Sequence, residues 1–360
     1  MGRIRVSTIV LGVAFALFAT VLVTLRETLR LAHIDESILK VASDASIYFE
    51  VFELLYADAD LIESPALFLV GSPMLFMKLA GGNLFIVQAC NLALMLVTLR
   101  VALVGLGTLS GRLFFVAGAL CFPYFLFGFL GLNKEIYAMC SAIFFGSYLI
   151  RGRRSHLLFA LLLAACARYY MLIALLVLFF TVPREGRPRY GLVVAVLLAF
   201  SAVAPVAKYI VPEYTTEGLL EDSGTIGIVF AWLIDHFAYA LTYPIKYAFL
   251  IPTRAYGYLV GASEDLMGAV VSALSVLMFL AACLAMLNHR RLDPLAKRLI
   301  VAGFVAPAPI MWSEIMHWRY YSFVYFFFLF ALLLQRERGR RPAPATPGAS
   351  QHAASEVQAR

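Results

Sequence analysis

The chain has 360 residues, of which 62% are hydrophobic and only 14% are charged, and its formal net charge is +7. A water-soluble domain carries about 25% charged residues, so this chain has too few of them to cover a surface that faces water on all sides. The composition therefore excludes a soluble globular protein. The positive charge does not indicate nucleic-acid binding either, because the Lys and Arg residues lie between long apolar runs, where such residues act as topology signals.

The apolar runs predict membrane-spanning helices, since a helix needs about 20 apolar residues to cross the hydrocarbon layer. Single spans are predicted at residues 6–25, 84–105, 112–131, 136–150, 190–211, 266–288, 299–317 and 320–335. The run at 157–183 differs, because it has Arg168 in its middle and basic segments at both ends. Basic flanks favour the cytoplasm, so we expect this run to be a hairpin of two short helices that turns at 167–170 near the outer face.

The expected fold is therefore all-α, a polytopic transmembrane bundle of about ten spans with both termini in the cytoplasm. The cytoplasmic segments are then residues 1–5, 100–112, 151–156, 184–189, 289–298 and 336–360. These segments hold 19 Lys and Arg and four acidic residues, whereas the rest of the chain holds 10 basic and 18 acidic residues. This asymmetry agrees with the positive-inside rule.

The domain organisation follows from the same topology. One membrane-embedded unit covers residues 1–335, with external loops at 26–83 and 212–265. Residues 336–360 lack apolar periodicity and are rich in Arg, Pro, Ala and Ser, so we expect a disordered, basic cytoplasmic tail.

Two further stretches, residues 65–82 and 226–260, do not have the pattern of a simple span. Residues 65–82 are broken by Gly71 and Pro73. A crossing there would move the basic segment 151–156 to the outside, so we expect a re-entrant or interfacial element within the long first external loop. Residues 226–260 either add a hairpin of two spans or form an external amphipathic layer.

Ionisable residues at membrane depth mark the candidate site, because each costs several kcal/mol on the milder scales unless it has a partner, a cavity or a function. In the expected topology, four distant segments bring such residues and neighbouring aromatic residues to the outer face. The candidates are Asp44 in the first loop, Lys134 and Glu135 in a turn, Arg168 and Tyr169 in the hairpin, and His317, Arg319 and Tyr320 between the last two spans. We expect them to line one polar cavity that opens to the exterior.

Such a set of residues suits sugar transfer from a lipid phosphate carrier. A carboxylate takes the proton from an acceptor hydroxyl, and Asp44 and Glu135 are both candidates for this catalytic role. Cations hold the phosphate or diphosphate leaving group, for which Lys134, Arg168 and Arg319 are candidates. The aromatic residues beside them offer flat faces to sugar rings.

Each candidate also has a structural interpretation that stays open at this point. Lys134 and Glu135 form a local turn pair, and a carboxylate is favoured at a helix N-terminus. In the structural interpretation, the Arg168 side chain only extends its charged group to the membrane–water interface. Asp44 is then a solvated loop residue, and His317 is an interfacial residue.

The order of these features resembles two groups of membrane glycosyltransferases. A first span, an external loop with Asp44 followed by Tyr48, and a Pro-containing apolar stretch that leads into a span are similar to the opening of the GT-C class, which uses polyprenyl-linked donors. The Asn-Lys-Glu turn at 133–135, the Arg-Tyr-Tyr hairpin at 168–170 and the His-Trp-Arg-Tyr-Tyr segment at 317–321 resemble Wzy-like oligosaccharide repeat-unit and exopolysaccharide polymerases. The resemblance rests on short motifs spread over residues 1–335.

The resemblance implies a role for each matching residue. Asp44 corresponds to the base of the external loop, although many GT-C members carry paired acids there. Lys134 and Glu135 correspond to the turn pair of the polymerases. Arg168 and Arg319 correspond to ligands of the phosphate or diphosphate.

The sequence thus predicts an integral membrane glycosyltransferase or polymerase in the bacterial inner membrane, active at the outer face in cell-surface polysaccharide synthesis. The donor is a sugar or oligosaccharide on a polyprenyl (di)phosphate, and the acceptor is a glycan or a lipid. Membrane lipids and other polysaccharide-assembly proteins are further expected partners, and nucleic acid is not. No cofactor is expected, and no metal, because no His, Cys or carboxylate cluster has ligand spacing.

Two rival interpretations belong to other classes of protein. In a transporter or flippase of lipid-linked sugars, the same cations would line a path without chemistry. Inverted repeats with interrupted spans in both halves would favour it, but the interruptions at 65–82 and 157–183 both lie in the first half. A structural membrane subunit would leave the outer-face Lys and Arg residues unexplained.

Overall fold

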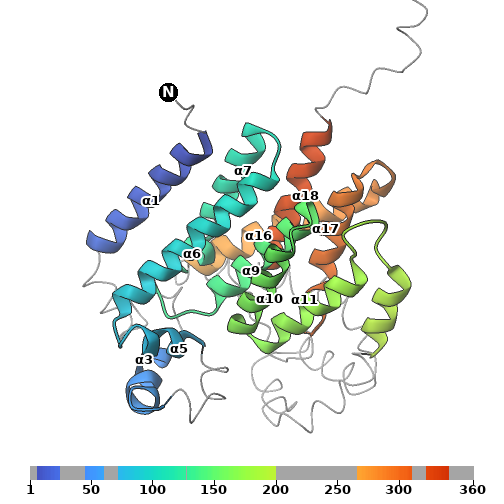
Figure 1. Cartoon of the computed structure of the whole chain (residues 1–360). Coiled ribbons are helices and arrows are strands. Elements are labelled where there is room, and N and C mark those ends of the chain that lie inside the picture. The colour runs from blue at the N-terminus through green and yellow to red at the C-terminus, as the bar shows by residue number, and fades with distance from the viewer. Residues whose placement is uncertain are drawn as a thin grey trace, which may run out of the picture.

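The computed structural model describes residues 6–24, 45–60, 72–126, 128–199, 266–309 and 322–339. Within these ranges the chain forms helices and contains no strand, which confirms the all-α class. The helices are α1 (Val6–Thr24), α3 (Ala45–Val51), α5 (Ser72–Leu79), α6 (Leu84–Gly105), α7 (Leu109–Leu120), α8 (Pro123–Leu126), α9 (Glu135–Arg151), α10 (Arg154–Ala167), α11 (Tyr169–Thr181), α16 (Leu266–Leu287), α17 (Pro294–Val305) and α18 (Val324–Gly339) (Figure 1). A π-helical turn (Phe52–Tyr56) follows α3, and a 3₁₀ turn (His289–Arg291) follows α16.

The helix α9 lies at the centre of the bundle and packs against α6, α10, α17 and α18. Thirteen of its 17 residues are buried, which agrees with a sequence that has no continuous polar face. At 1.5 Å per residue, α9 is about 25 Å long, so its first and last residues lie at opposite ends of the bundle. Glu135 therefore lies far from Arg151.

Aromatic side chains of α18 fill much of the core. Gly146 of α9 has Phe330 against it, and Gly303 of α17 has Phe328 so close that a Cβ would collide with the ring. The ring of Phe330 also packs on Phe115 of α7, with centroids 4.6 Å apart. Small residues thus let α18 approach α9 and α17 closely enough to bury its phenylalanines.

Several predicted spans match the helices closely. The predicted span 84–105 has the same bounds as α6, and α1 and α9 begin and end within one residue of 6–25 and 136–150. The run 157–183 is two helices, as predicted, because the helical pattern stops at Arg168 between α10 and α11. The two helices form a V in Figure 1.

Other predicted boundaries were wrong. The span 112–131 is not one helix, because α7 ends at Leu120 and Pro123 starts the short α8, as expected where Pro lacks a backbone donor. The predicted span 299–317 starts earlier, since Asp293 caps the N-terminus of α17, and that helix ends at Val305. The tail does not begin at residue 336, because α18 continues to Gly339.

Part of the segment predicted as the first external loop, residues 26–83, also forms helices. Within 65–82, the described residues form α5 (Ser72–Leu79), and residues 65–71 lie outside the described residues. Phe52 and Tyr56 of the first loop pack with Met74 and Met77 of α5 in a small core that also includes Val87 and Leu132. Residues 226–260, for which two alternatives were open, lie outside the described residues.

One helix of the described chain, Leu84–Gly105, is long and apolar enough to cross a membrane, judged by length and composition. Shorter apolar helices include Leu109–Leu120, Arg154–Ala167, Tyr169–Thr181 and Tyr190–Ala199. Many of their outward side chains are large and apolar: Leu158 is 57% exposed, Leu162 53% and Leu284 of α16 67%. The outer surface of the bundle is therefore largely hydrophobic.

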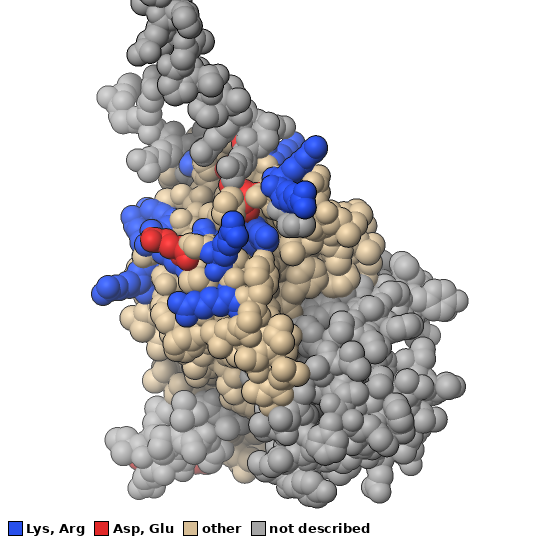
Figure 2. Space-filling model, turned by 90° about the vertical axis from the view of Figure 1, so that its right-hand side faces the viewer, with Lys and Arg blue, Asp and Glu red and all other residues tan. Residues whose placement is uncertain are grey.

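The two ends of the bundle differ in charge. Figure 2 shows Lys and Arg side chains gathered toward one end of the face in view, which we call the basic end. The described residues that belong to the segments at this end are Arg100, Arg112, Arg151, Arg153, Arg154, Arg184, Arg187, Arg189, Arg290, Arg291, Lys297, Arg298 and Arg336. The first residue of α9 and the junction of α10 with α11 lie at the opposite end (Figure 1).

The C-terminal turn of α18 is fixed to the basic end by a buried carboxylate. Glu337 accepts hydrogen bonds from the backbone N–H groups of Gly107 (3.2 Å) and Thr108 (2.9 Å) and from the Thr108 hydroxyl (2.6 Å). Gly111 leaves room for this carboxylate, since a Cβ there would collide with Oε1 of Glu337. The Arg336 guanidinium lies over the ring of Phe114, 4.2 Å from its centroid. These contacts join α18 to the start of α7.

Candidate functional site

The turn before α9 carries two of the predicted site residues and is fixed by Asn133. The Asn133 side chain accepts a hydrogen bond from the backbone N–H of Glu135 at 3.1 Å. Lys134 occupies the N-cap position without capping the helix through its side chain. The amide of Asn133 therefore does the capping.

Buried polar residues of α6 and α9 hold the loop that leads into this turn. Gln88 donates to the carbonyl of Leu130 at 2.6 Å, and Asn91 donates to the carbonyl of Gly131 at 3.5 Å. Tyr137 of α9 donates to the Asn91 side chain at 3.0 Å. A buried, fully bonded network of this kind fixes the loop in one conformation.

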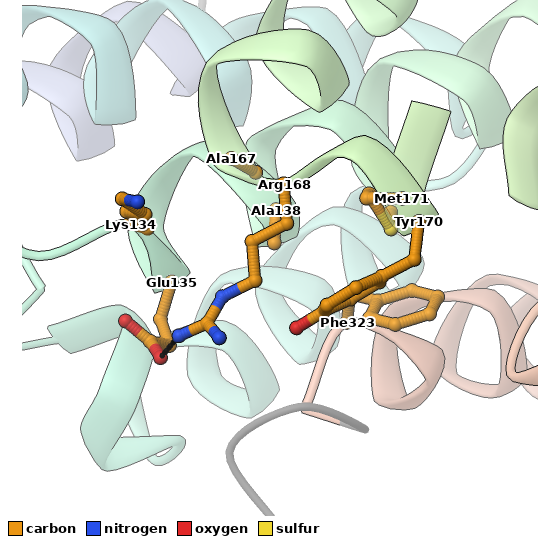
Figure 3. Close-up of a pocket in the computed structure, with 8 residues that line it drawn as sticks. All are labelled: Lys134, Glu135, Ala138, Ala167, Arg168, Tyr170, Met171 and Phe323. Atoms are coloured by element: carbon orange, nitrogen blue, oxygen red, sulfur yellow. Dashed lines mark hydrogen bonds and ion pairs between the residues drawn. The ribbon is translucent and has the colours of Figure 1, made fainter. Parts of the chain in front are cut away.

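Arg168 occupies the vertex between α10 and α11. Its backbone is extended (φ −165°, ψ 148°), so the chain turns at this one residue. The backbone groups at the break remain bonded, because Arg168 N–H donates to the Ala164 carbonyl at 3.0 Å and the Arg168 carbonyl accepts from Met171 at 3.0 Å. Both backbone groups of Arg168 are therefore bonded at the break, and its side chain points toward Glu135 (Figure 3).

The side chains of Arg168 and Glu135 meet between these two elements. Nη2 of Arg168 donates to Oε1 of Glu135 at 3.2 Å. The Glu135 side chain is only 4% exposed and that of Arg168 is 21% exposed. Burial of a carboxylate this deep is unfavourable unless a cation pairs with it, and Arg168 is that cation.

The ion pair lines a hollow with about 250 Å³ of space outside the atoms, its open side included. The lining residues are Lys134, Glu135, Ala138, Ala167, Arg168, Tyr170, Met171 and Phe323. Figure 3 shows the Arg168 guanidinium between the Glu135 carboxylate and the Tyr170 ring, and its Cζ lies 5.8 Å from that ring's centroid. The hollow thus combines one carboxylate, two cations and aromatic faces.

The segment predicted as the first external loop reaches the same region. The Lys134 ammonium lies over the ring of Tyr48 in α3, 5.3 Å from its centroid. The Ser72 hydroxyl at the start of α5 donates to the carbonyl of Cys166, near the end of α10. Residues from the loop, the turn, the hairpin and the start of the last helix therefore lie around one site.

Three predicted site residues, Lys134, Glu135 and Arg168, line the hollow together. Tyr169 does not line it, because its side chain points outward and is 65% exposed, and Tyr170 takes that position instead. The other candidates, Asp44, His317, Arg319 and Tyr320, lie outside the described residues. Phe323, which follows Tyr320 by three positions, does line the hollow.

Sequence reasoning missed several residues that build the site. Gln88 and Asn91 were detectable, because polar amides three residues apart in an apolar helix need partners on one helix face. Ala138 was also detectable, since it lies three residues after Glu135. Met171 and Phe323 carry no signal that separates them from other core residues.

Comparison of the chain with family models, with curated proteins and with solved structures gives no match. Among the described residues, no three His, Cys, Asp or Glu side chains lie close enough together to hold a metal ion.

Proposed function

We propose that the protein is a multi-pass helical protein of the bacterial inner membrane, with about ten spans, a GT-C-like arrangement and both termini in the cytoplasm. The apolar outer surface of the helices supports this proposal, since large exposed hydrophobic surfaces are unfavourable in water. The gathering of Lys and Arg residues at one end supports the orientation, because that end is then cytoplasmic. The hollow with Glu135 and Arg168 then faces the exterior.

We further propose that the protein is a glycosyltransferase or polymerase that uses a sugar on a polyprenyl phosphate or diphosphate, in the synthesis of cell-surface polysaccharide. The observation that carries this proposal is the buried carboxylate of Glu135, 3.2 Å from the guanidinium of Arg168 in a hollow that Lys134 also lines. A base and two cations are what transfer from a phosphate carrier requires.

The proposed step moves one proton and one sugar. The acceptor hydroxyl oxygen forms a bond to the anomeric carbon, the bond from that carbon to the phosphate oxygen breaks, and the carboxylate takes the hydroxyl proton. Arg168 and Lys134 hold the charge that develops on the phosphate or diphosphate as it leaves. The rings of Tyr170 and Phe323 provide apolar faces against which a sugar ring can lie.

Glu135 is our first choice for the base, and Asp44 is the second. Asp44 directly precedes α3, whose Tyr48 contacts Lys134. Arg319 is proposed as a further phosphate ligand, with His317 and Tyr320 beside it in the sequence as substrate-binding residues. Replacing Asp44 by Asn and Glu135 by Gln separates the two carboxylates, since only loss of the true base removes turnover from folded protein.

The test uses proteoliposomes that contain the purified protein, a bacterial lipid extract as acceptor and a panel of ¹⁴C-labelled hexoses on undecaprenyl phosphate or diphosphate. Transfer is measured as label that leaves the donor, together with release of undecaprenyl phosphate or diphosphate. Glu135→Gln is compared with Glu185→Gln, which makes the same change at a carboxylate that is 83% exposed. We expect wild type and Glu185→Gln to consume one donor and Glu135→Gln not to.

The same vesicles test the transporter alternative. If the labelled donor moves from one leaflet to the other while its sugar–phosphate bond stays intact, the protein is a flippase and the transfer proposal is wrong. Donors that stay intact and in place throughout the panel would also count against sugar transfer.

A further inference from the structure

Lys134 contacts an aromatic ring that comes from the segment predicted as the first external loop. Its ammonium lies over the ring of Tyr48 in α3, with Nζ 5.3 Å from the ring centroid. An ammonium within about 6 Å of the centroid of an aromatic ring is attracted to the ring face. Both residues are half-buried, so water screens this attraction only in part. The contact joins α3 to the turn that begins α9.

The ring of Tyr48 is itself held in place by packing. It packs against the small core that consists of Phe52, Tyr56, Met74, Met77, Val87 and Leu132. Leu132, a member of this core, lies two positions before Lys134 in the chain. The same core therefore fixes both the ring and the segment that carries the ammonium.

The flexible stem of a lysine gains a defined orientation from such a contact. Lysine carries its charge on a four-carbon stem that adopts many rotamers in water. Capping of α9 does not orient Lys134, because its side chain makes no capping hydrogen bond and Asn133 accepts from Glu135 N–H instead. The ring of Tyr48 supplies an orienting contact that the helix start does not.

We propose that Tyr48 is a positioning residue, whose ring holds the Lys134 ammonium at the hollow in the orientation that receives the phosphate or diphosphate of the donor. This inference rests on the sugar transfer proposed above. Arg168 also lies near a tyrosine ring, with Cζ 5.8 Å from the centroid of Tyr170. A cation that is already oriented loses less conformational entropy when it binds an anion. Tyr48 thus acts on the donor through Lys134 and does not touch it.

The first experiment needs no donor and is independent of sugar transfer. The purified full-length protein in detergent is treated with a limiting amount of acetic anhydride, and mass spectrometry gives the acetylation rate of each lysine. A ring face stabilises an ammonium, and an ammonium does not react until it loses its proton. We expect Tyr48→Leu to raise the rate at Lys134 about two- to fivefold. Tyr48→Phe keeps the ring and should leave that rate unchanged.

Tyr190→Leu is the matched control for the loss of a ring. Tyr190 lies under the ammonium of Lys297 at the basic end, with Nζ 5.8 Å from the ring centroid. The control therefore removes the same kind of contact far from the hollow, and the rate at Lys134 should not change. An unchanged rate at Lys134 in folded Tyr48→Leu overturns the proposal, and so does an equal rise in Tyr48→Phe or Tyr190→Leu.

A double-mutant cycle tests whether Tyr48 acts through Lys134. The kcat/KM for donor consumption is measured in the proteoliposome assay for Tyr48→Leu, for Lys134→Met and for the variant with both changes. We expect a loss of about fivefold for Tyr48→Leu and about 10²-fold for Lys134→Met, with no further loss in the double variant. Losses that multiply in the double variant would show that Tyr48 acts independently of Lys134, which overturns the proposal.

The two experiments separate this proposal from the function on which it rests. If wild type consumes no donor, sugar transfer is refuted, and the role of Lys134 toward phosphate is refuted with it, whatever the acetylation rates are. If wild type consumes the donor and Tyr48→Leu matches it in both kcat/KM and acetylation, sugar transfer stands and only the positioning role of Tyr48 is refuted.

Discussion

Glu135 and Glu337 are both buried carboxylates, and they lie at opposite ends of the bundle. Glu337 accepts three hydrogen bonds from the Gly107–Thr108 turn, from two backbone N–H groups and one hydroxyl. Glu135 meets the side chain of Arg168 and borders a hollow. The first carboxylate is bound by groups that belong to the scaffold, and the second by a long side chain that can also reach a ligand. The kind of partner, and not burial itself, separates a structural carboxylate from a candidate catalytic one.

The largest effect is expected when Arg168 is replaced by Ala. Sugar transfer should fall about 10²–10³-fold, as it does when one group that stabilises developing negative charge is removed. The measurement is release of undecaprenyl phosphate or diphosphate by protein that remains in the membrane. Guanidinium ions added at millimolar concentration should restore part of the activity, and Arg100→Ala should leave it unchanged. Full activity of Arg168→Ala would show that Arg168 does not hold the phosphate. Full activity of Arg319→Ala would show the same for Arg319.

Replacement of Glu337 by Ala should lower the stability of the protein and leave its sugar-transfer activity unchanged. We expect a loss of about 3 kcal/mol in stability, because three donors of the Gly107–Thr108 turn lose their acceptor at a buried position. Sugar transfer per folded molecule should stay the same. Thermal unfolding in detergent, followed by size exclusion, gives the first quantity and the vesicle assay gives the second. A turnover defect in folded Glu337→Ala would erase the distinction between the two carboxylates.

Gly111→Ala tests the same contact from the other side. The added methyl group would collide with the Glu337 carboxylate, so we expect a loss of about 1–3 kcal/mol. Gly191→Ala is the control. Gly191 lies in the helix Tyr190–Ala199, and a Cβ at this position would have no atom within 4 Å. Alanine is favoured over glycine in a helix by about 1 kcal/mol, so the control should be slightly more stable than wild type. Equal thermal unfolding midpoints for the two variants would contradict the close packing of Glu337 against Gly111.

The smallest effect is expected at the two tyrosines after Arg168. Tyr170→Ala should lower kcat/KM about tenfold, or about 1.4 kcal/mol, because its ring lines the hollow beside the guanidinium. Tyr169→Ala should change kcat/KM less than twofold, since that side chain points away. Steady-state kinetics with the consumed donor compares them. A larger effect at Tyr169 would show that the outward face of the hairpin contacts the substrate.

Apolar length and charge predicted the fold where the chain follows simple rules. The bounds of α6 and the break at Arg168 follow from hydropathy and from one basic residue inside an apolar run. The break at Pro123 was missed, because hydropathy alone does not register a proline within an apolar run. Glu337 was missed because it lies among arginines and its partners are some 230 positions away in the sequence.

The site was predictable in part. Lys134, Glu135 and Arg168 stood out because charged residues are rare at such positions. The sequence could not predict which of Tyr169 and Tyr170 lines the hollow. Neighbouring residues on a helix point about 100° apart, and only packing decides which one faces inward. Gln88 and Asn91 stand out as polar amides in an apolar helix, but the sequence does not show that their partners are the backbone carbonyls of Leu130 and Gly131.

The extended backbone at Arg168 has an evolutionary consequence. A φ near −165° is open to every amino acid except proline, so the vertex of the hairpin does not require arginine for its shape. Mutation at this codon leaves α10 and α11 able to form as they are. The hairpin and the side chain at its vertex can therefore vary separately, and homologues with another residue at this vertex should keep the hairpin.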